Sequence, residues 1–181
     1  MTGREIVLGV TGGIAAYKSA ALASQLVQAG AGVTAVLTAA AEKFIGRATF
    51  EALTGRRVLS HVFDEPGHPL GAHIELAQRG QLLVVAPATA NFMAKAAHGA
   101  ADDLLSTLYL SFTGPVLVAP AMNCEMWEKA AVQRNVQQLR ADGVHFVDPE
   151  EGWLSCRTRG VGRMAAPERI FAVIRELLER K

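Results

Sequence analysis

The chain has 181 residues, of which 50% are hydrophobic and 19% are charged, and its 18 Lys and Arg nearly balance its 17 Asp and Glu. This composition excludes an intrinsically disordered protein and predicts one domain over residues 1–181. A formal net charge of +1 argues against nucleic-acid binding, which normally needs a clustered basic surface. No apolar stretch approaches the ~20 residues that cross a bilayer, and the N-terminus does not resemble a signal peptide. We therefore expect a cytoplasmic protein with no membrane partner.

Short apolar runs alternate with helical patterns along the chain. The runs are only about five residues long and apolar on both faces, which is typical of parallel strands buried between helices. This alternation predicts an α/β fold: a single-domain Rossmann or flavodoxin-like doubly wound parallel sheet flanked by helices. We expect strands at 6–10, 33–38, 82–86, 115–119 and 144–147, with 58–63 as a candidate short extra strand, and helices at 14–29, 40–53, 91–98, 104–112, 129–142 and 167–180.

Ligands of such folds bind at the carboxyl ends of the strands. The loops that follow the predicted strands there are 11–13, 38–40, 87–91 and 120–127. The segment 148–166 is rich in Gly and Arg, shows no periodicity, and is longer than a connection needs to be. Long irregular segments of this kind are often functional, so we predict a substrate flap there.

The first of these loops is rich in glycine. Gly9, Gly12 and Gly13 lack the G-x-G-x-x-G spacing of a dinucleotide-binding fingerprint. Tyr17 stands where a phosphate-binding P-loop needs its second glycine, which argues against nucleotide hydrolysis. Two interpretations stay open: the Gly12-Gly13 pair forms a structural tight turn, or it lets the backbone approach a flat or anionic ligand.

Two further loops carry polar residues directly after buried strands. Thr89 and Asn91 could cap the helix that follows them, or the same helix N-terminus could bind a phosphate. Asn123 offers both a donor and an acceptor, which suits a carboxylate or an amide ligand. The alternative for Asn123 is an Asx turn or a helix cap before Glu125.

The histidines and cysteines give weaker signals. A lone histidine such as His73 is most often a surface residue or a core residue with satisfied hydrogen bonds. His61, His68 and His73 lack the spacing of a zinc site and have no cysteine nearby, so we expect no metal. Cys124 and Cys156 are too few for a disulfide framework.

Cys156 lies in a basic segment with Arg157, Arg159 and Arg163. Neighbouring arginines lower the pKa of a thiol and attract anions. We therefore expect a reactive thiol in a mobile basic flap, and the alternative is an exposed loop with an incidental cysteine.

Together these motifs resemble the flavin-dependent cysteine decarboxylases, over about residues 5–165. The string Pro-Ala-Met-Asn-x-x-Met-Trp at 120–127 is highly specific, whereas the Gly-Gly turn alone is not. The matching pieces run in the order of the family: residues 11–16, His73, and residues 87–91, 120–127 and 154–164.

The resemblance implies bound FMN and a reaction with no net oxidation. In the branch that it suggests, the substrate is phosphopantothenoylcysteine and the product is 4'-phosphopantetheine, a step of coenzyme A biosynthesis. The flavin of these enzymes oxidises the terminal cysteine to a thioaldehyde, which loses CO2, and the resulting enethiolate is then reduced. The chain would therefore be a carboxy-lyase.

Roles for individual residues follow from the same resemblance. His73 would be the base, Asn123 would hold the substrate carboxylate, and Cys156 would protonate the enethiolate. The implied flavin contacts are Gly12, Gly13, Ile14, Thr38, Ala39, Ala40, Ala88, Thr89, Ala90, Asn91 and Ala121. The implied substrate contacts are Asn123, Met126, Trp153, Leu154, Ser155 and Arg163.

The resemblance also implies an assembly, and the chain departs from the family at one position. Members form homotrimers or dodecamers with flavin sites at subunit interfaces. The family flap usually reads Leu-Ala-Cys-Gly, whereas this chain has Leu154-Ser-Cys-Arg157, so Arg157 removes backbone freedom beside the thiol. Many bacterial relatives carry a second synthetase domain. Since 181 residues leave no room for it, we expect a stand-alone decarboxylase or one half of a two-gene pair.

Two other functions remain as alternatives. A peptidyl-cysteine decarboxylase would act on the C-terminal cysteine of a peptide and release the unsaturated enethiol, so it would not need Cys156. A non-catalytic regulatory relative would bind a partner protein, but such relatives lose the reactive residues or carry acidic extensions. Flavin prenyltransferases share the fold and lack the string that contains Asn123.

Overall fold

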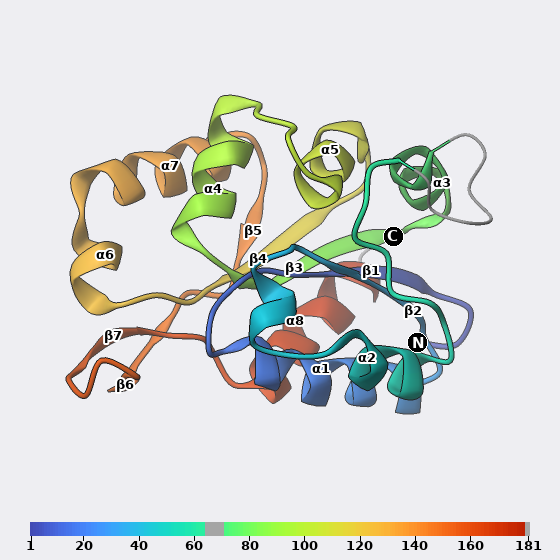
Figure 1. Cartoon of the computed structure of the whole chain (residues 1–181), viewed down its shortest axis with the longest axis horizontal. Coiled ribbons are helices and arrows are strands. Elements are labelled where there is room, and N and C mark those ends of the chain that lie inside the picture. Colours follow the sequence, from blue (N-terminus) through green and yellow to red (C-terminus); the bar gives the residue numbers. More distant parts are fainter. Residues whose placement is uncertain (64–70, 180–181) are drawn as a thin grey trace.

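The computed structural model describes residues 1–63 and 71–179, and within them a parallel sheet forms the centre of the molecule (Figure 1). Its five strands run in the order β2-β1-β3-β4-β5, and each neighbouring pair is parallel. This order is that of flavodoxin-like folds, so the predicted fold class is confirmed. The strands are β1 (Glu5–Val10), β2 (Gly32–Leu37), β3 (Leu82–Ala88), β4 (Val116–Pro120) and β5 (His145–Phe146).

Helices cover both faces of the sheet (Figure 1). One face packs against α1 (Ala16–Gln28), α2 (Arg47–Thr54) and α8 (Pro167–Glu179). The other packs against α3 (Ala72–Arg79), α4 (Ala90–His98), α5 (Leu104–Ser111) and α7 (Ala130–Ala141), and the short α6 (Cys124–Glu128) links β4 to α7. Across residues 1–63 and 71–179, none of the helices has the length and apolar character to cross a membrane.

The alternation of side chains along each strand creates two hydrophobic cores. In β1, Ile6 and Leu8 point into the core beneath α1 and α8, whereas Val7 points into the core beneath α3 and α5. Both sets of side chains are buried because helices cover both faces, which explains why the strands read as continuous apolar runs. The burial anchors the strand ends from which the ligand-binding loops emerge.

The helices α3 and α6 were not among the predicted elements, and three expected segments take a different form. The helix predicted at 40–53 is divided into the 3-10 helix η1 (Ala41–Lys43) and α2, because Gly46 is extended between them, with φ −76° and ψ 149°. The strand considered at 58–63 makes only an isolated bridge, from Leu59 to Val36. The predicted flap contains an antiparallel hairpin of β6 (Glu150–Trp153) and β7 (Arg159–Arg163).

Candidate functional site

The loops at the carboxyl edge of the sheet are bonded to one another. The Thr11 hydroxyl donates to the Pro87 carbonyl at 2.7 Å and accepts from the backbone N–H of Thr89 at 3.0 Å. The backbone N–H of Ala121 donates to the Ala88 carbonyl at 3.1 Å. These contacts join the loops that follow β1, β3 and β4, so three of the four predicted ligand loops form one surface.

A cavity of about 600 Å³ opens between these loops and the loop after β2. Gly12 packs so closely on Ala40 that an added Cβ would clash, whereas a Cβ at Gly13 would meet nothing within 4 Å. Glycine is therefore required at position 12 to bring the two loops together. We call this the first cavity, and it is lined by Thr11, Gly12, Thr38, Ala39, Ala40, Thr89, Ala90, Asn91, Phe92, Lys95, Asp103 and Met126.

The N-terminus of α4 forms one wall of the first cavity. Thr89 is the N-cap, and its side chain accepts a hydrogen bond from the backbone N–H of Phe92. Asn91 lies in the first turn of the helix and also lines the cavity. The capping interpretation of Thr89 is therefore confirmed, and it is compatible with ligand binding because the cap leaves the helix N-terminus facing the cavity.

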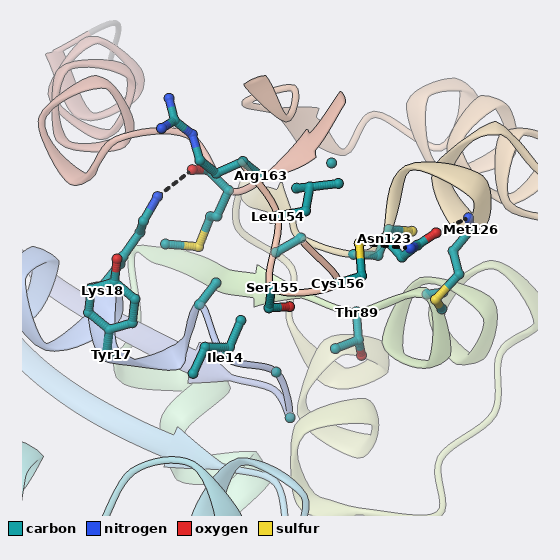
Figure 2. Close-up of a pocket in the computed structure, with 18 of the residues that line it drawn as sticks. Ile14, Tyr17, Lys18, Thr89, Asn123, Met126, Leu154, Ser155, Cys156 and Arg163 are labelled. Carbon is teal, nitrogen blue, oxygen red and sulfur yellow. Dashed lines mark hydrogen bonds between the residues drawn. The ribbon is translucent and has the colours of Figure 1, made fainter. Parts of the chain in front are cut away.

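A second cavity, of about 420 Å³, lies between the β1–α1 loop, the start of α6 and the hairpin (Figure 2). It adjoins the first, because Gly12, Thr89, Ala90 and Met126 line both. All six predicted substrate contacts line it. The lining consists of Gly12, Gly13, Ile14, Ala15, Tyr17, Lys18, Thr89, Ala90, Ala121, Met122, Asn123, Met126, Trp153, Leu154, Ser155, Cys156, Gly162, Arg163 and Met164.

Asn123 makes two kinds of contact with one amide group. Its Oδ1 accepts from the backbone N–H groups of Glu125, at 2.8 Å, and Met126, at 3.4 Å, and so caps α6. Its Nδ2 donates to the Sγ of Cys156 at 3.2 Å, across 33 residues of sequence (Figure 2). The cap fixes the orientation of the amide and leaves its donor side directed at the thiol.

The thiol of Cys156 is exposed and lies within 3.0 Å of the Thr158 hydroxyl. Hydrogen bonds from Thr158, and a further one from the Asn123 amide, lower the pKa of this thiol below its ordinary value. Donors of this kind stabilise the thiolate more than the thiol. The prediction that Cys156 has a lowered pKa is therefore confirmed.

The cause that we expected for this lowered pKa is wrong. The pKa of the thiol is lowered by hydrogen bonds, not by the arginines of the flap. Arg159 pairs with Glu151 at 3.2 Å and Arg163 pairs with Glu150 at 3.3 Å, so nearby carboxylates offset both charges. Arg157 has a φ of 64°, which makes it the only non-glycine residue with a positive φ within 1–63 and 71–179. A left-handed backbone at this position favours glycine.

The hairpin is held over the second cavity from two sides. The Met122 backbone N–H donates to the Gly162 carbonyl at 3.0 Å, and a Cβ at Gly160 would lie 2.8 Å from the Cβ of Cys124. On the other side, the Nζ of Lys18 donates to the Met164 carbonyl at 2.9 Å (Figure 2). The hairpin is therefore closed in this structure, with Cys156 beside the Asn123 amide.

His73 lies apart from this cluster within one chain. It is in the first turn of α3, which lies at the opposite end of the molecule from the hairpin (Figure 1), and it lines neither cavity. Its Nδ1 is buried and has no hydrogen-bond partner among residues 1–63 and 71–179. Ala88 is also absent from both linings, because it is buried in β3. His68 lies outside the described residues.

Sequence reasoning missed three charged residues of the cavities. Lys95 and Asp103 line the first cavity, and Lys18 lines the second. One signal was available for Lys95, because it lies four residues after Asn91 and therefore on the same face of α4. Lys18 directly follows Tyr17, the residue that argues against a P-loop, and no other pattern in the sequence singles it out.

Comparison with known proteins identifies the family. The sequence profile of the Flavoprotein family matches residues 1–179. The chain belongs to the Flavoprotein family. It is 45% identical over 170 residues to the Coenzyme A biosynthesis bifunctional protein CoaBC of Bacillus subtilis (strain 168), covering 94% of this chain and 42% of the relative. The Haemophilus influenzae protein of that name is 39% identical over 181 residues, covering 100% and 45%. The chain thus spans less than half the length of these curated relatives.

Two solved structures extend the likeness over almost the whole chain. The FMN-dependent cysteine decarboxylase SpaF has a TM-score of 0.85 at 35% identity, with 98% of this chain and 97% of that chain covered. A PPC decarboxylase variant complexed with pantothenoylaminoethenethiol has a TM-score of 0.89 at 29% identity, with 97% and 98% covered. Both share the α/β fold described above.

Proposed function

We propose that the chain is an FMN-dependent phosphopantothenoylcysteine decarboxylase, which forms 4'-phosphopantetheine in coenzyme A biosynthesis. The observation that carries this proposal is the contact of the Asn123 amide with the Cys156 thiol in the second cavity. This cavity adjoins the first cavity, which is suited to a flavin. The names of the CoaBC relatives and of the PPC decarboxylase structure support the same reaction.

The first cavity fits FMN by shape and by chemistry. Its volume of about 600 Å³ is typical of a cofactor-sized ligand, and small side chains at Gly12, Ala39, Ala40 and Ala90 leave room for a flat ring. The N-terminus of α4 offers backbone N–H groups to an anion. FMN, when bound, would accept two electrons from the substrate cysteine and return them after CO2 has left, so the reaction needs no other redox partner.

The second cavity would hold the reacting cysteine of the substrate. We assign Asn123 to the substrate carboxylate, because its amide donor faces this cavity and its cap fixes that orientation. We assign Cys156 to protonation of the enethiolate, since the Sγ–H can supply the proton that reduction to the saturated thiol requires. A lowered pKa suits this role, because proton transfer is most efficient when the pKa of the donor is near the working pH. Met126, Trp153, Leu154, Ser155 and Arg163 would enclose the rest of the substrate.

A second copy of the chain would complete the site. We propose a homotrimer, or a dodecamer built from four trimers, in which His73 of one copy reaches the Asn123 and Cys156 of another and acts as the base. His73 lines neither cavity of its own chain and its side chain is only partly buried, which supports a role at a site formed with another copy. Ile14 and Met126, which are 57% and 46% exposed at the rim of the site, supply apolar surface for the contact.

We further propose that residues 1–181 act as one flavoprotein domain whose segment 148–166 is the substrate flap. We place the reaction in the cytoplasm. The free thiols of Cys124 and Cys156 support a reducing compartment, where the proposed proton donor would remain a thiol.

The first test combines the purified protein with FMN and phosphopantothenoylcysteine and follows the products by mass spectrometry. Loss of one CO2 with the saturated thiol as product is the expected result. A protein that binds FMN and leaves this substrate unchanged would overturn the proposed substrate. A parallel reaction on a peptide with a C-terminal cysteine identifies the peptide-modifying alternative, and inactivity toward both substrates would favour a regulatory role.

A further inference from the structure

The first cavity carries a charged pair that the proposed mechanism does not use. The Nζ of Lys95 lies 2.8 Å from the Oδ2 of Asp103 and 2.6 Å from the Oδ1 of Asp102. Among the described residues that line the cavity, only Lys95 and Asp103 are ionisable, and their side chains are 19% and 30% exposed, against 67% for Asp102. A cation and an anion are therefore fixed in a wall that is otherwise built from small or neutral side chains.

The local sequence fixes both members of the pair. Lys95 is on α4, four residues after Asn91, so both residues belong to the face of the helix that lines the cavity. Asp103 is the N-cap of α5, and it shares a capping box with Ser106, whose backbone N–H donates to its Oδ1 at 2.8 Å. Because Ser106 is fully buried, the Asp103 carboxylate has little freedom to turn away.

Both groups are charged at neutral pH. Burial raises the pKa of the Asp103 carboxyl, but hydrogen bonds from Lys95 and Ser106 outweigh it and hold the pKa below its ordinary value. Burial lowers the pKa of the Lys95 ammonium, and the bonds to Asp102 and Asp103 outweigh this effect, so its pKa is raised. Charges in a half-buried wall are screened less by solvent and salt than charges on the surface.

We propose that the Lys95–Asp103 pair sets the relative affinity of the cavity for the oxidised and the reduced flavin. The inference rests on the proposed function, because it needs FMN in the first cavity. Reduced flavin readily carries a negative charge on its ring, whereas oxidised flavin is neutral there. The ammonium of Lys95 therefore stabilises the reduced form and the carboxylate of Asp103 opposes it, and charge near the ring is one of the levers by which proteins tune a flavin.

Two substitutions test this balance from opposite sides. Lys95→Met removes the cation and leaves two carboxylates, so the affinity for reduced relative to oxidised FMN should fall about tenfold, a decrease of about 30 mV in midpoint potential for a two-electron couple. Asp103→Asn removes the opposing charge and keeps a good N-cap residue, so the midpoint potential should rise. The measurement is a reductive titration of the bound FMN against a reference dye.

Matched controls separate charge from structure. Lys95→Arg keeps the cation and should restore a potential close to that of the wild type, and Lys129→Met removes an exposed lysine that lines neither cavity and should cause no shift. The dissociation constant of oxidised FMN, from quenching of its fluorescence, is measured for each variant.

The outcomes distinguish this inference from the proposed function. Opposite shifts for Lys95→Met and Asp103→Asn support the inference. Shifts of the same sign, or none, in variants that still bind FMN would overturn it and leave the decarboxylase proposal intact. A wild-type protein that binds no FMN would overturn both. If Lys95→Met fails to fold, the Asp103→Asn variant tests the inference by itself: a higher midpoint potential supports it, and a lower or unchanged one overturns it.

Discussion

The two ends of the Asn123 amide make different contacts. Its carbonyl oxygen caps α6 and its nitrogen donates to the Cys156 thiol, so the helix cap orients the donor end of the amide. The helix-cap interpretation is therefore confirmed, and binding of a substrate carboxylate by the same amide stays a prediction.

Replacing Asn123 by Asp separates the two roles. Asp is as good an N-cap as Asn, so α6 should keep its position. The variant loses the N–H donor and adds a negative charge beside the substrate carboxylate, so kcat/KM should fall roughly 100-fold. Steady-state kinetics and an FMN titration check this. Unchanged kinetics would contradict the assignment, and lost FMN binding would show that the residue instead supports the cofactor cavity.

The pH dependence of product formation should report on the Cys156 thiol. Because its pKa is lowered and only the thiol can donate a proton, the saturated fraction of product should fall as pH rises, beginning below the pH at which an ordinary cysteine ionises. Thr158→Val removes the hydroxyl that contributes most to the lowered pKa and keeps the shape of the side chain. In this variant, the decrease in the saturated fraction of product should begin at a higher pH than in the wild type.

Mass spectrometry of the products across a pH series measures this shift for the wild type and for Thr158→Val. Arg157→Gln is the matched control in the same turn, since no arginine is among the causes of the lowered pKa. A profile that moves with Arg157→Gln and not with Thr158→Val would restore the arginine explanation that the structure replaces.

The hairpin is positioned by close backbone contacts with the start of α6. Gly160 permits this approach, since an added Cβ would lie 2.8 Å from the Cβ of Cys124 and 3.1 Å from its Sγ. Cys156 is carried by the turn that joins β6 to β7, so any displacement of β7 moves the thiol away from Asn123.

Gly160→Ala should therefore affect one step of the reaction and not the other. The displaced hairpin should still allow CO2 release, while the saturated product falls at least severalfold and the unsaturated thiol accumulates. Gly46→Ala is the control, because a Cβ there meets nothing within 4 Å and the backbone is an ordinary extended one. Equal loss of both steps in Gly160→Ala would mean that the hairpin contributes to the whole site and not to protonation alone.

Within one chain, His73 and Asn123 lie far apart. Complementation between copies that carry different variants is therefore a direct test of the assembly. His73→Asn should be inactive alone, and Asn123→Asp should show the roughly 100-fold loss of kcat/KM given above. If one copy supplies His73 and another supplies Asn123, mixed oligomers of the two variants should regain roughly a quarter of the wild-type sites. Activity of the co-expressed, co-purified mixture, with its mass from sedimentation, measures this. A mixture as inactive as its components would contradict a shared site.

The sequence by itself determined the sheet and the place of the ligand loops. Buried parallel strands read as short apolar runs, and strands that alternate with helices can be wound in few ways, so the order of elements and the carboxyl edge followed from local pattern. It also pointed to Asn123 and the glycine pair, because they stand in loops at that edge, and to Cys156, because it stands among arginines in the predicted flap.

Only the tertiary structure decided how these residues are used. The contact between Asn123 and Cys156 spans 33 residues of sequence, and the hydroxyl that lowers the thiol pKa belongs to Thr158, whose direction depends on the hairpin. The hairpin has no apolar alternation for the sequence to show, since it is held by glycine packing and ion pairs. The ion pair of Lys95 and Asp103 could not be predicted for a similar reason. Contacts between helices depend on how the helices pack, which no local pattern encodes.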